Sequence, residues 1–360
     1  MALMIDDFRD AELCKKLIAK IEKEAVKDCY RFMEVCGSHT MAIAKFGIKS
    51  ILPKNIDLIS GPGCPVCVTP QCEIDALFDI ASGGAVIATF GDMMRVPGAD
   101  GQNLQKMKSA GADVRIVFSP LDTLKIAKET DKEVVFVGIG FETTAPAVAG
   151  LALMAKKGGY KNVSITPYNK TMPEVLSLIL SDDNLKINGF VCPGHVTAVT
   201  GIGLYDPVVA QGMSAVVTGF EPVDILSSIL EMVRQVNTGD YKAMNMYSRV
   251  VSDEGNEKAR QVIDTVYEKQ GCWWRGIGFI EDSGLAFRKE YEEFDAFKRF
   301  NVNLEGDDEI AGCSCGDVLK GYIKPNECAL FGSACTPVNP VGPCMVSSEG
   351  ACAAAYKYGI

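Results

Sequence analysis

The residues of this chain with the most evident chemical potential are its cysteines and histidines. The 360-residue sequence contains 14 cysteines and only 2 histidines. Both histidines follow a cysteine at the same spacing, in Cys36-Gly-Ser-His39 and Cys192-Pro-Gly-His195. A thiolate and an imidazole placed in this way can hold one metal ion or act as a nucleophile and its base. Cysteine hydrolases usually hold the two groups far apart in sequence, whereas a two-residue metal site leaves other coordination positions to outside ligands. The motif alone leaves both interpretations open.

A second cysteine motif lies in the segment GPGCPVCVTP, where Cys64 and Cys67 form a Cys-x-x-Cys pair. The pair follows a predicted strand and precedes a predicted helix, for which Thr69 is the expected cap and Pro70 the expected first residue. A helix N-terminus lowers the pKa of a nearby thiol, which favours a redox-active pair. Half of a zinc site is the alternative, but the sequence offers no matching second half.

The C-terminal segment 311–360 is rich in cysteine, glycine and proline, so hydrophobic burial alone cannot organise it. Its six cysteines follow the pattern Cys313-x-Cys315-x12-Cys328-x6-Cys335-x8-Cys344-x7-Cys352. Thiolates bind iron–sulfur clusters and zinc, but zinc sites usually contain two short Cys-x-x-Cys-like pairs, which this pattern lacks. A [4Fe–4S] cluster needs four of the cysteines and leaves two for a redox-active pair. Zinc binding and disulfide bonds alone are the other two interpretations.

Three further polar residues follow predicted strands and are candidates for the same site. Glu142 and Glu221 each occur in a Gly-Phe-Glu turn, and His195 lies in the turn VCPGHV. At the end of a strand, a glutamate can stabilise the start of a helix or act in a cleft as a proton acceptor. His195 can support a metal ligand or form an ordinary buried hydrogen bond. The sequence leaves these alternatives open.

The composition describes a globular protein with enough apolar material for a sizeable core, since 48% of the residues are hydrophobic and 23% are charged. The net charge of −10 argues against a general nucleic-acid-binding protein. The first residues, MALMIDDFRD, do not resemble a secretory signal, and no apolar run is long enough to span a bilayer. We therefore expect a cytoplasmic protein without membrane association, in which cysteines serve metal or redox chemistry rather than a secreted disulfide scaffold.

The elements that must position these residues alternate between strands and helices. The first ~30 residues read as a helix, because leucine and isoleucine recur there at helical spacing. Strands are predicted over 56–60, 84–90, 114–119, 133–140, 163–166, 187–192 and 214–220. Helices are predicted over 70–82, 145–157, 223–236 and 253–270, with a charged amphipathic stretch at 287–300. Continuous apolar strands separated by helices predict parallel sheets covered by helices on both faces.

Four short motifs suggest an internal repeat. The Gly-Phe-Glu turns at 137–146 and 217–226 resemble one another, as do the Cys/Pro/Gly turns at 60–67 and 191–196. We therefore predict an α/β protein with two Rossmann-like lobes, residues 33–142 and 143–236. A third, mainly helical and cysteine-rich domain is expected from residues 1–32 together with 237–360. All four motifs end strands, which is where open α/β sheets place their sites.

Taken together, MEVCGSHT, GPGCPVCVTP, GFETTAP, CPGHV, GFEP and the cysteine-rich tail resemble the HypD family of [NiFe]-hydrogenase maturation factors. The matching motifs run from residue 33 to residue 352. The resemblance implies a scaffold that, together with a HypC-type partner, assembles the Fe(CN)2CO group of the hydrogenase. It also implies a HypE-type partner that donates cyanide, and the hydrogenase large subunit as the eventual recipient.

The resemblance further implies roles for individual residues. Cys36 is the expected iron ligand and His39 its essential neighbour, while Cys64 and Cys67 correspond to a redox dithiol. The tail is similar to that of ferredoxin:thioredoxin reductase, in which a [4Fe–4S] cluster lies beside a disulfide. By that analogy the cluster ligands are Cys313, Cys328, Cys335 and Cys352, and the redox pair is Cys315 and Cys344. Exchanging Cys344 and Cys352 gives the main rival assignment.

Two other functions fit parts of the sequence. A free-standing iron–sulfur thiol-disulfide oxidoreductase would have an exposed Cys64–Cys67 pair and would not need Cys36. A structural module that binds zinc would use the tail alone.

Overall fold

The structure is a computed structural model that describes residues 5–182, 184–304 and 312–359. Its larger sheet has five parallel strands in the order β11-β10-β9-β1-β2. The strands are β1 (Tyr30–Glu34), β2 (Ile56–Ser60), β9 (Gly189–Pro193), β10 (Ser214–Thr218) and β11 (Ala243–Asn245). The inner strands β9 and β10 are buried along their whole length, which explains their continuous apolar sequence.

The second sheet has four parallel strands in the order β4-β3-β5-β7. These strands are β3 (Val86–Thr89), β4 (Val114–Ile116), β5 (Val134–Phe136) and β7 (Val163–Ile165). Two shorter pairings complete the strand structure. They are the parallel pair β6 (Ile139–Gly140) and β8 (Tyr168–Asn169), and the antiparallel hairpin β12 (Tyr267–Trp274) and β13 (Gly278–Phe287).

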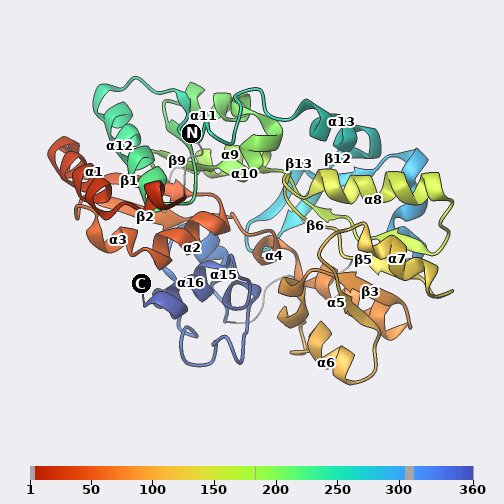
Figure 1. Ribbon diagram of the computed structural model, residues 1–360. Coiled ribbons are helices and arrows are strands. Elements are labelled where there is room, and N and C mark those ends of the chain that lie inside the picture. The colour runs from red at the N-terminus through yellow and green to blue at the C-terminus, as the bar shows by residue number, and fades with distance from the viewer. Residues whose placement is uncertain (1–4, 183, 305–311, 360) are drawn as a thin grey trace.

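Helices cover both sheets (Figure 1). Those of seven residues or more are α1 (Ala11–Glu24), α2 (Gly37–Lys45), α5 (Gln71–Ser82), α7 (Asp122–Lys128), α8 (Ala145–Gly158), α9 (Met172–Leu180), α10 (Gly194–Thr200), α12 (Pro222–Thr238), α13 (Glu257–Val266) and α16 (Ala351–Tyr358). The shorter α-helices are α3 (Ile48–Ile51), α4 (Pro65–Val68), α6 (Leu104–Ser109), α11 (Asp206–Ala210), α14 (Ala296–Arg299) and α15 (Cys315–Leu319). Short 3-10 turns connect them. None of the helices in the described part of the chain combines the length and apolar character needed to cross a membrane.

Local sequence explains several helix boundaries. Asp10 caps α1 by accepting the backbone N–H groups of Glu12 and Leu13. The helices α8 and α12 each end at a glycine in the left-handed conformation, Gly159 and Gly239. The helix α5 begins at Gln71 with Pro70 as its cap, so the expected cap and first residue are each one position too early. The short helix α4 forms instead within the Cys-x-x-Cys motif itself.

One continuous hydrophobic core joins the two sheets to the cysteine-rich tail. It contains Met33 and Phe190 from the five-stranded sheet, Val135 from the four-stranded sheet, and Cys344 from the tail. Cys64 and Cys67 also lie in this core, and their helix α4 occupies the middle of the molecule in Figure 1. Two further cores fill the outer side of each sheet, under α1 and α12 and under α8 respectively. The dithiol motif therefore lies where the three parts of the chain meet.

The prediction of an α/β protein with two parallel sheets and a cysteine-rich C-terminal region is confirmed. All seven predicted strands occur, although 133–140 is divided between β5 and β6. The helix predicted over 253–270 is shorter, because β12 begins at Tyr267, and the hairpin makes the region after residue 237 less helical than expected. The strand β1, which carries the chain into Cys36, and the hairpin β12–β13 are elements that the sequence reading did not include.

The strand order also departs from the expected repeat. The five-stranded sheet takes β2 from within 33–142 and β9 and β10 from within 143–236, and its strand β1 crosses the predicted boundary at residue 33. The turns after β2 and β9 therefore belong to one sheet, and their interpretation as matching turns of two lobes is wrong. The chain enters the four-stranded sheet after β2 and returns at β9. The sheets consequently do not follow the two continuous segments predicted.

Candidate functional site

The two histidines lie at the ends of neighbouring strands in the five-stranded sheet. The strands β1 and β9 pair in parallel, so the helices that follow them, α2 and α10, begin side by side. The rings of His39 and His195 both stack on Phe220, with centroid distances of 4.5 Å and 4.1 Å. The two Cys-x-x-His motifs therefore lie side by side, and both imidazoles contact the same aromatic ring, that of Phe220.

Cys36 is the capping residue of α2 and is 9% exposed. Burial raises the pKa of its thiol to about 12, and the nearby carboxyl group of Glu349 acts in the same direction. The backbone N–H groups of His39 and Ser38 act in the opposite direction. The thiol is therefore protonated at neutral pH, and a cation bound to its sulfur would favour the thiolate.

His39 is fully buried, and burial lowers the pKa of its imidazole to about 4. Its Nε2 lies 3.0 Å from the carbonyl oxygen of Gly219. Because a carbonyl can only accept a hydrogen bond, Nε2 carries the proton and Nδ1 carries a lone pair. His39 is thus a neutral ring held in one orientation. Its Nδ1 is a hydrogen-bond acceptor without a partner among the described residues.

A cavity of about 290 Å³ opens at Cys36 between the two sheets. His195 lines this cavity, whereas His39 is not among its lining residues. The opposite wall consists of residues between Ile139 and Thr144, and the tail contributes Ser347 and Glu349. The position of the cavity at the carboxyl ends of strands agrees with the general rule for α/β proteins.

The turn that precedes the Cys64–Cys67 pair packs directly against the backbone of Cys36. Gly63 also lines the cavity, and its carbonyl oxygen accepts a hydrogen bond of 2.9 Å from the N–H group of Gly37. A Cβ atom added at Gly63 would lie 2.2 Å from the backbone nitrogen of Cys36, so only glycine permits this approach. Cys64 and Cys67 follow at once and are joined as a disulfide in this structure, with exposures of 3% and 1%.

Three consecutive tail residues fasten the cysteine-rich region to this site. The hydroxyl of Ser347 lies 3.3 Å from Sγ of Cys64, and the hydroxyl of Ser348 donates to the carboxylate of Asp92 at 2.6 Å. Glu349 accepts a hydrogen bond of 2.7 Å from Ser38, inside the Cys36 motif. These residues were not singled out from the sequence, because serine and glutamate in a cysteine-rich segment carry no distinctive signal. They place Glu349 at the cavity as a further candidate site residue.

The two glutamates of the Gly-Phe-Glu turns lie outside the cavity wall. Glu221 caps α12 and forms an ion pair with Arg9, which holds the pKa of its carboxyl below the usual range. Glu142 is buried, and one of its carboxylate oxygens accepts the N–H group of Met172 at 2.8 Å, at the start of α9. Glu221 therefore stabilises the start of the helix that follows it, α12. Glu142 does not cap the helix that follows it, α8, but stabilises the first turn of α9.

Glu142 provides a pH-dependent contribution to stability. Burial raises its pKa from 4.5 to about 7, and its second oxygen has no hydrogen-bond partner in the described residues. The folded protein therefore retains a proton there that the unfolded chain loses above pH 4.5. This contribution is complete below pH 4.5 and is lost as the pH rises through 7. It is worth on the order of 3 kcal/mol.

We accordingly expect the free energy of unfolding of the wild type to fall relative to that of Glu142→Gln between pH 5 and pH 8. Glutamine retains the oxygen that accepts from Met172 and cannot ionise. Urea denaturation of both proteins across this range measures the difference. A constant difference between the two proteins would contradict the assigned pKa.

All six tail cysteines line one small apolar cavity, together with Leu330 and Met345. Sγ of Cys315 and Sγ of Cys344 lie 3.2 Å apart, and both residues are buried. Cys335 accepts the N–H group of Val341 at 3.3 Å. Among the described residues, no three histidine, cysteine, aspartate or glutamate side chains converge on a single ion position. The thiols instead surround a shared space, an arrangement that fits a multinuclear centre with one thiolate on each iron.

The whole chain is similar to proteins of hydrogenase maturation. Residues 12–359 match the family described as HypD, hydrogenase formation hypA family. The chain is 43% identical to the hydrogenase maturation factor HypD of Rhodobacter capsulatus, over 98% of this chain and 97% of the relative. It is 42% identical to HypD of Cupriavidus necator (99% and 97%) and to HypD2 of Bradyrhizobium diazoefficiens (98% and 96%).

These matches extend over nearly the full length of the chain and include every cysteine group described above. The chain belongs to the HypD family of hydrogenase maturation factors.

Proposed function

We propose that this hydrogenase maturation factor is the scaffold on which the Fe(CN)2CO group of a [NiFe]-hydrogenase is assembled. The observation that carries the proposal is the meeting of three cysteine groups. The Cys36 cavity, the Cys64–Cys67 pair and the tail cysteines are joined through Gly63 and Ser347 into one continuous region. A scaffold that holds iron and attaches new ligands to it needs a residue that anchors the iron and, close to that residue, a source of electrons.

In this proposal Cys36 anchors the iron cargo. A soft thiolate suits low-spin ferrous iron, and iron binding replaces the proton that the buried thiol otherwise retains. His39 holds a neutral ring in one orientation near this anchor, because its Nε2 donates to the carbonyl of Gly219. The displaced proton leaves to solvent through the open cavity. His195 and Glu349 face the cavity and can contact the ligands of the iron.

Cys64 and Cys67 act in the proposal as a redox dithiol. Transfer of cyanide from a thiocyanate-type carrier to iron is formally reductive, and a dithiol can supply the two electrons by forming a disulfide. The tail cysteines Cys313, Cys328, Cys335 and Cys352 would hold a [4Fe–4S] cluster, with Cys315 and Cys344 as the adjacent pair. Such a cluster supplies single electrons when bound. The contact between Cys315 and Cys344 supports this pairing.

The proposed partners follow from the same role. A HypC-type chaperone would deliver iron at the open side of the Cys36 cavity, and a HypE-type protein would donate cyanide there. The completed group then passes to the hydrogenase large subunit, in the cytoplasm. Neither nucleic acid nor a membrane has a part in this scheme.

A free-standing thiol-disulfide oxidoreductase is the alternative. It requires the Cys64–Cys67 pair to reach the disulfide of another protein. Residues Cys64 and Cys67 are only 3% and 1% exposed, and the hydroxyl of Ser347 lies against the sulfur of Cys64. Their burial favours electron transfer within the protein over direct attack on a protein substrate.

The dithiol role predicts a two-electron titration of Cys64 and Cys67. We expect denaturing alkylation followed by mass spectrometry to find both cysteines unmodified in the oxidised protein and both modified after reduction. Cys64→Ser should abolish this pairwise change, whereas Cys72→Ser, in the following helix α5, should preserve it. If both thiols are alkylated at every potential tested, they are not a redox couple.

A further inference from the structure

The turn of the hairpin β12–β13 lies between the dithiol loop and the tail cysteines. Arg275 follows β12 directly, and its backbone N–H donates to the carbonyl of Val68, immediately after Cys67, at 2.8 Å. On its other side, the turn packs backbone against backbone on the residue after Cys315. A Cβ atom added at Gly276 would lie 2.3 Å from Cα of Gly316. The turn therefore touches both proposed redox sites.

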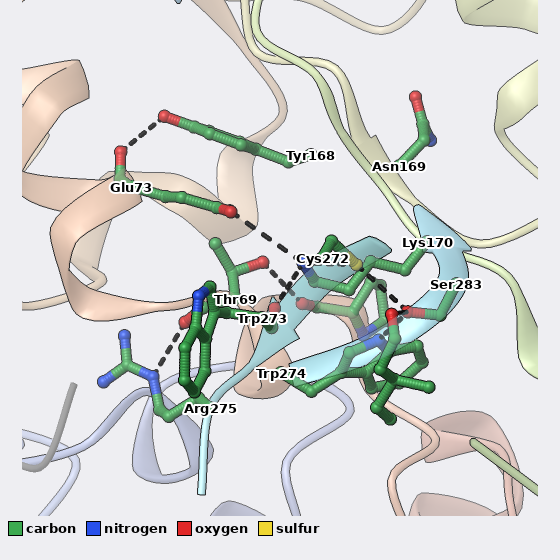
Figure 2. Close-up of polar contacts among 12 residues, drawn as sticks. Thr69, Glu73, Tyr168, Asn169, Lys170, Cys272, Trp273, Trp274, Arg275 and Ser283 are labelled. Carbon is green, nitrogen blue, oxygen red and sulfur yellow. Dashed lines mark hydrogen bonds and ion pairs between the residues drawn. The ribbon is translucent and has the colours of Figure 1, made fainter. Parts of the chain in front are cut away.

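The side chain of Arg275 extends the contact with the dithiol loop. Its Nε donates to the carbonyl of Thr69 at 2.8 Å, and Nη1 donates to the side-chain oxygen of Gln71 at 3.0 Å. Figure 2 shows the guanidinium directed at Thr69 and away from Lys170 and Cys272, whose Nζ and Sγ atoms lie 3.7 Å apart. Two hydrogen bonds to the backbone of Val68 and Thr69 and one to the side chain of Gln71 thus hold the segment between Cys67 and α5 in place.

The guanidinium is buried without an anionic partner. Arg275 is 3% exposed, its side-chain hydrogen-bond partners among the described residues are neutral, and Nη2 has none there. An arginine remains charged in proteins, and burying a charge without a counter-charge is strongly unfavourable. Such a residue points to an anionic group nearby.

The tail cysteines are the groups that can supply this negative charge. Gly276, the residue after Arg275, packs backbone against backbone on Gly316, next to Cys315, so the cavity of the tail cysteines lies beside the turn that carries this charge. Thiolates that hold an iron–sulfur centre make the site anionic, and its reduction adds a further negative charge. A cation in a low-dielectric interior stabilises the more negative state.

We propose that Arg275 is the internal counter-charge of the cysteine-rich centre and the positioning residue that ties this centre to the loop of the Cys64–Cys67 pair. The inference rests on the proposed function, because it assumes an iron–sulfur centre in the tail. It adds a structural reason why the hairpin inserts between the two sites. The charge favours the reduced centre, and the hydrogen bonds keep the dithiol loop in a fixed position.

Four variants distinguish the counter-charge role of Arg275 from its positioning role. Arg275→Gln removes the charge and weakens the hydrogen bonds, whereas Arg275→Lys keeps the charge and loses the planar group that reaches both Thr69 and Gln71. Gln71→Met removes one partner and leaves the arginine in place. Arg288→Gln is the matched control, since Arg288 ends the same hairpin at the protein surface.

The experiment is a redox titration of the visible absorption of the purified protein, combined with hydrogen exchange over residues 68–71. We expect Arg275→Gln to shift the equilibrium at least tenfold toward the oxidised centre, which corresponds to 59 mV for a one-electron couple. Arg275→Lys and Gln71→Met should stay within about threefold of the wild type in the titration while exchange in the loop accelerates. Arg288→Gln should change neither quantity.

The opposite results identify which proposal fails. A coloured Arg275→Gln protein with the wild-type potential overturns the counter-charge role. A tenfold shift in Arg275→Lys overturns it as well, even if Arg275→Gln does not fold. Unchanged exchange in Arg275→Lys overturns the positioning role. A colourless wild-type protein overturns the proposed iron–sulfur function and the inference with it.

Discussion

Replacement of Cys36 by alanine is expected to abolish hydrogenase maturation while leaving the fold intact. The change removes only one buried sulfur, which costs about 1 kcal/mol of stability. In the proposed function it also removes the anchor of the iron cargo. Loss of residues that merely support a metal ligand typically lowers activity 10–100-fold, so loss of the ligand itself should lower it by about 100-fold or more. Hydrogenase activity in a strain lacking its own copy of the gene, complemented by each variant, measures the effect.

Cys192→Ala provides the matched control. Cys192 occupies the equivalent Cys-x-x-His frame on the neighbouring strand β9, is fully buried, and donates to the carbonyl of Phe190. It does not line the Cys36 cavity. We expect this variant to mature hydrogenase at a rate close to that of the wild type. Equal losses in the two variants would mean that Cys36 serves folding and not iron binding.

Cys335→Ser is expected to remove the visible absorption of the purified protein and to unfold the tail. Cys335 is 7% exposed within the shared cavity of the six cysteines. If the tail holds the proposed cluster, the binding energy of that cluster also contributes to the folding energy of the tail. The absorption should fall to less than about a tenth of the wild-type value, since a [4Fe–4S] cluster requires four thiolates. Limited proteolysis should then cut the tail while the two sheets remain intact.

The same measurement distinguishes the two assignments of the tail cysteines. We expect Cys352→Ser to lose the absorption and Cys344→Ser to retain it, because Cys344 already contacts Cys315. The opposite result would favour the rival assignment. The control is Cys29→Ser, which alters an exposed cysteine outside the tail. Full absorption in Cys335→Ser, or a colourless wild-type protein that contains zinc, would contradict a cluster at this position.

The strands of both sheets were predictable because parallel strands are buried on both faces. Their sequences are short runs of valine, isoleucine and alanine between turn residues, as in GAVIATF around β3 and SAVVTGF around β10. The strand β1 was missed because Tyr30–Glu34 mixes charged and aromatic residues and lies at the end of the segment predicted to be helical. Its alternation of tyrosine, arginine and phenylalanine was the available signal.

The arrangement of the strands could not be predicted in the same way. Whether β9 pairs with β1 or with β7 depends on contacts between residues more than 150 positions apart, for which the local sequence contains no information. The hairpin β12–β13 was missed because the aromatic segment CWWRGIGFI suggested no alternation. The glycines at 276 and 278 between two aromatic runs were the signal for a turn.

The candidate site was predictable as far as its residue types are chemically distinctive. Cys36, Cys64, Cys67 and the tail cysteines were selected by type and spacing, and the structure places these groups in one region. The sequence did not separate the roles of the histidines, because the stacking of both rings on Phe220 depends on the pairing of β1 with β9. The contacts of Ser347, Ser348 and Glu349 depend equally on tertiary packing.

Infrared spectroscopy of the protein purified together with the proposed HypC-type partner tests the central claim most directly. Metal-bound cyanide and carbon monoxide absorb in a region that is otherwise free of protein bands. If the protein is the assembly scaffold and Cys36 holds the iron, the wild-type complex shows these bands and the Cys36→Ala complex lacks them. Bands that persist in Cys36→Ala would contradict Cys36 as the anchor, and a wild-type complex without them would contradict the scaffold role itself.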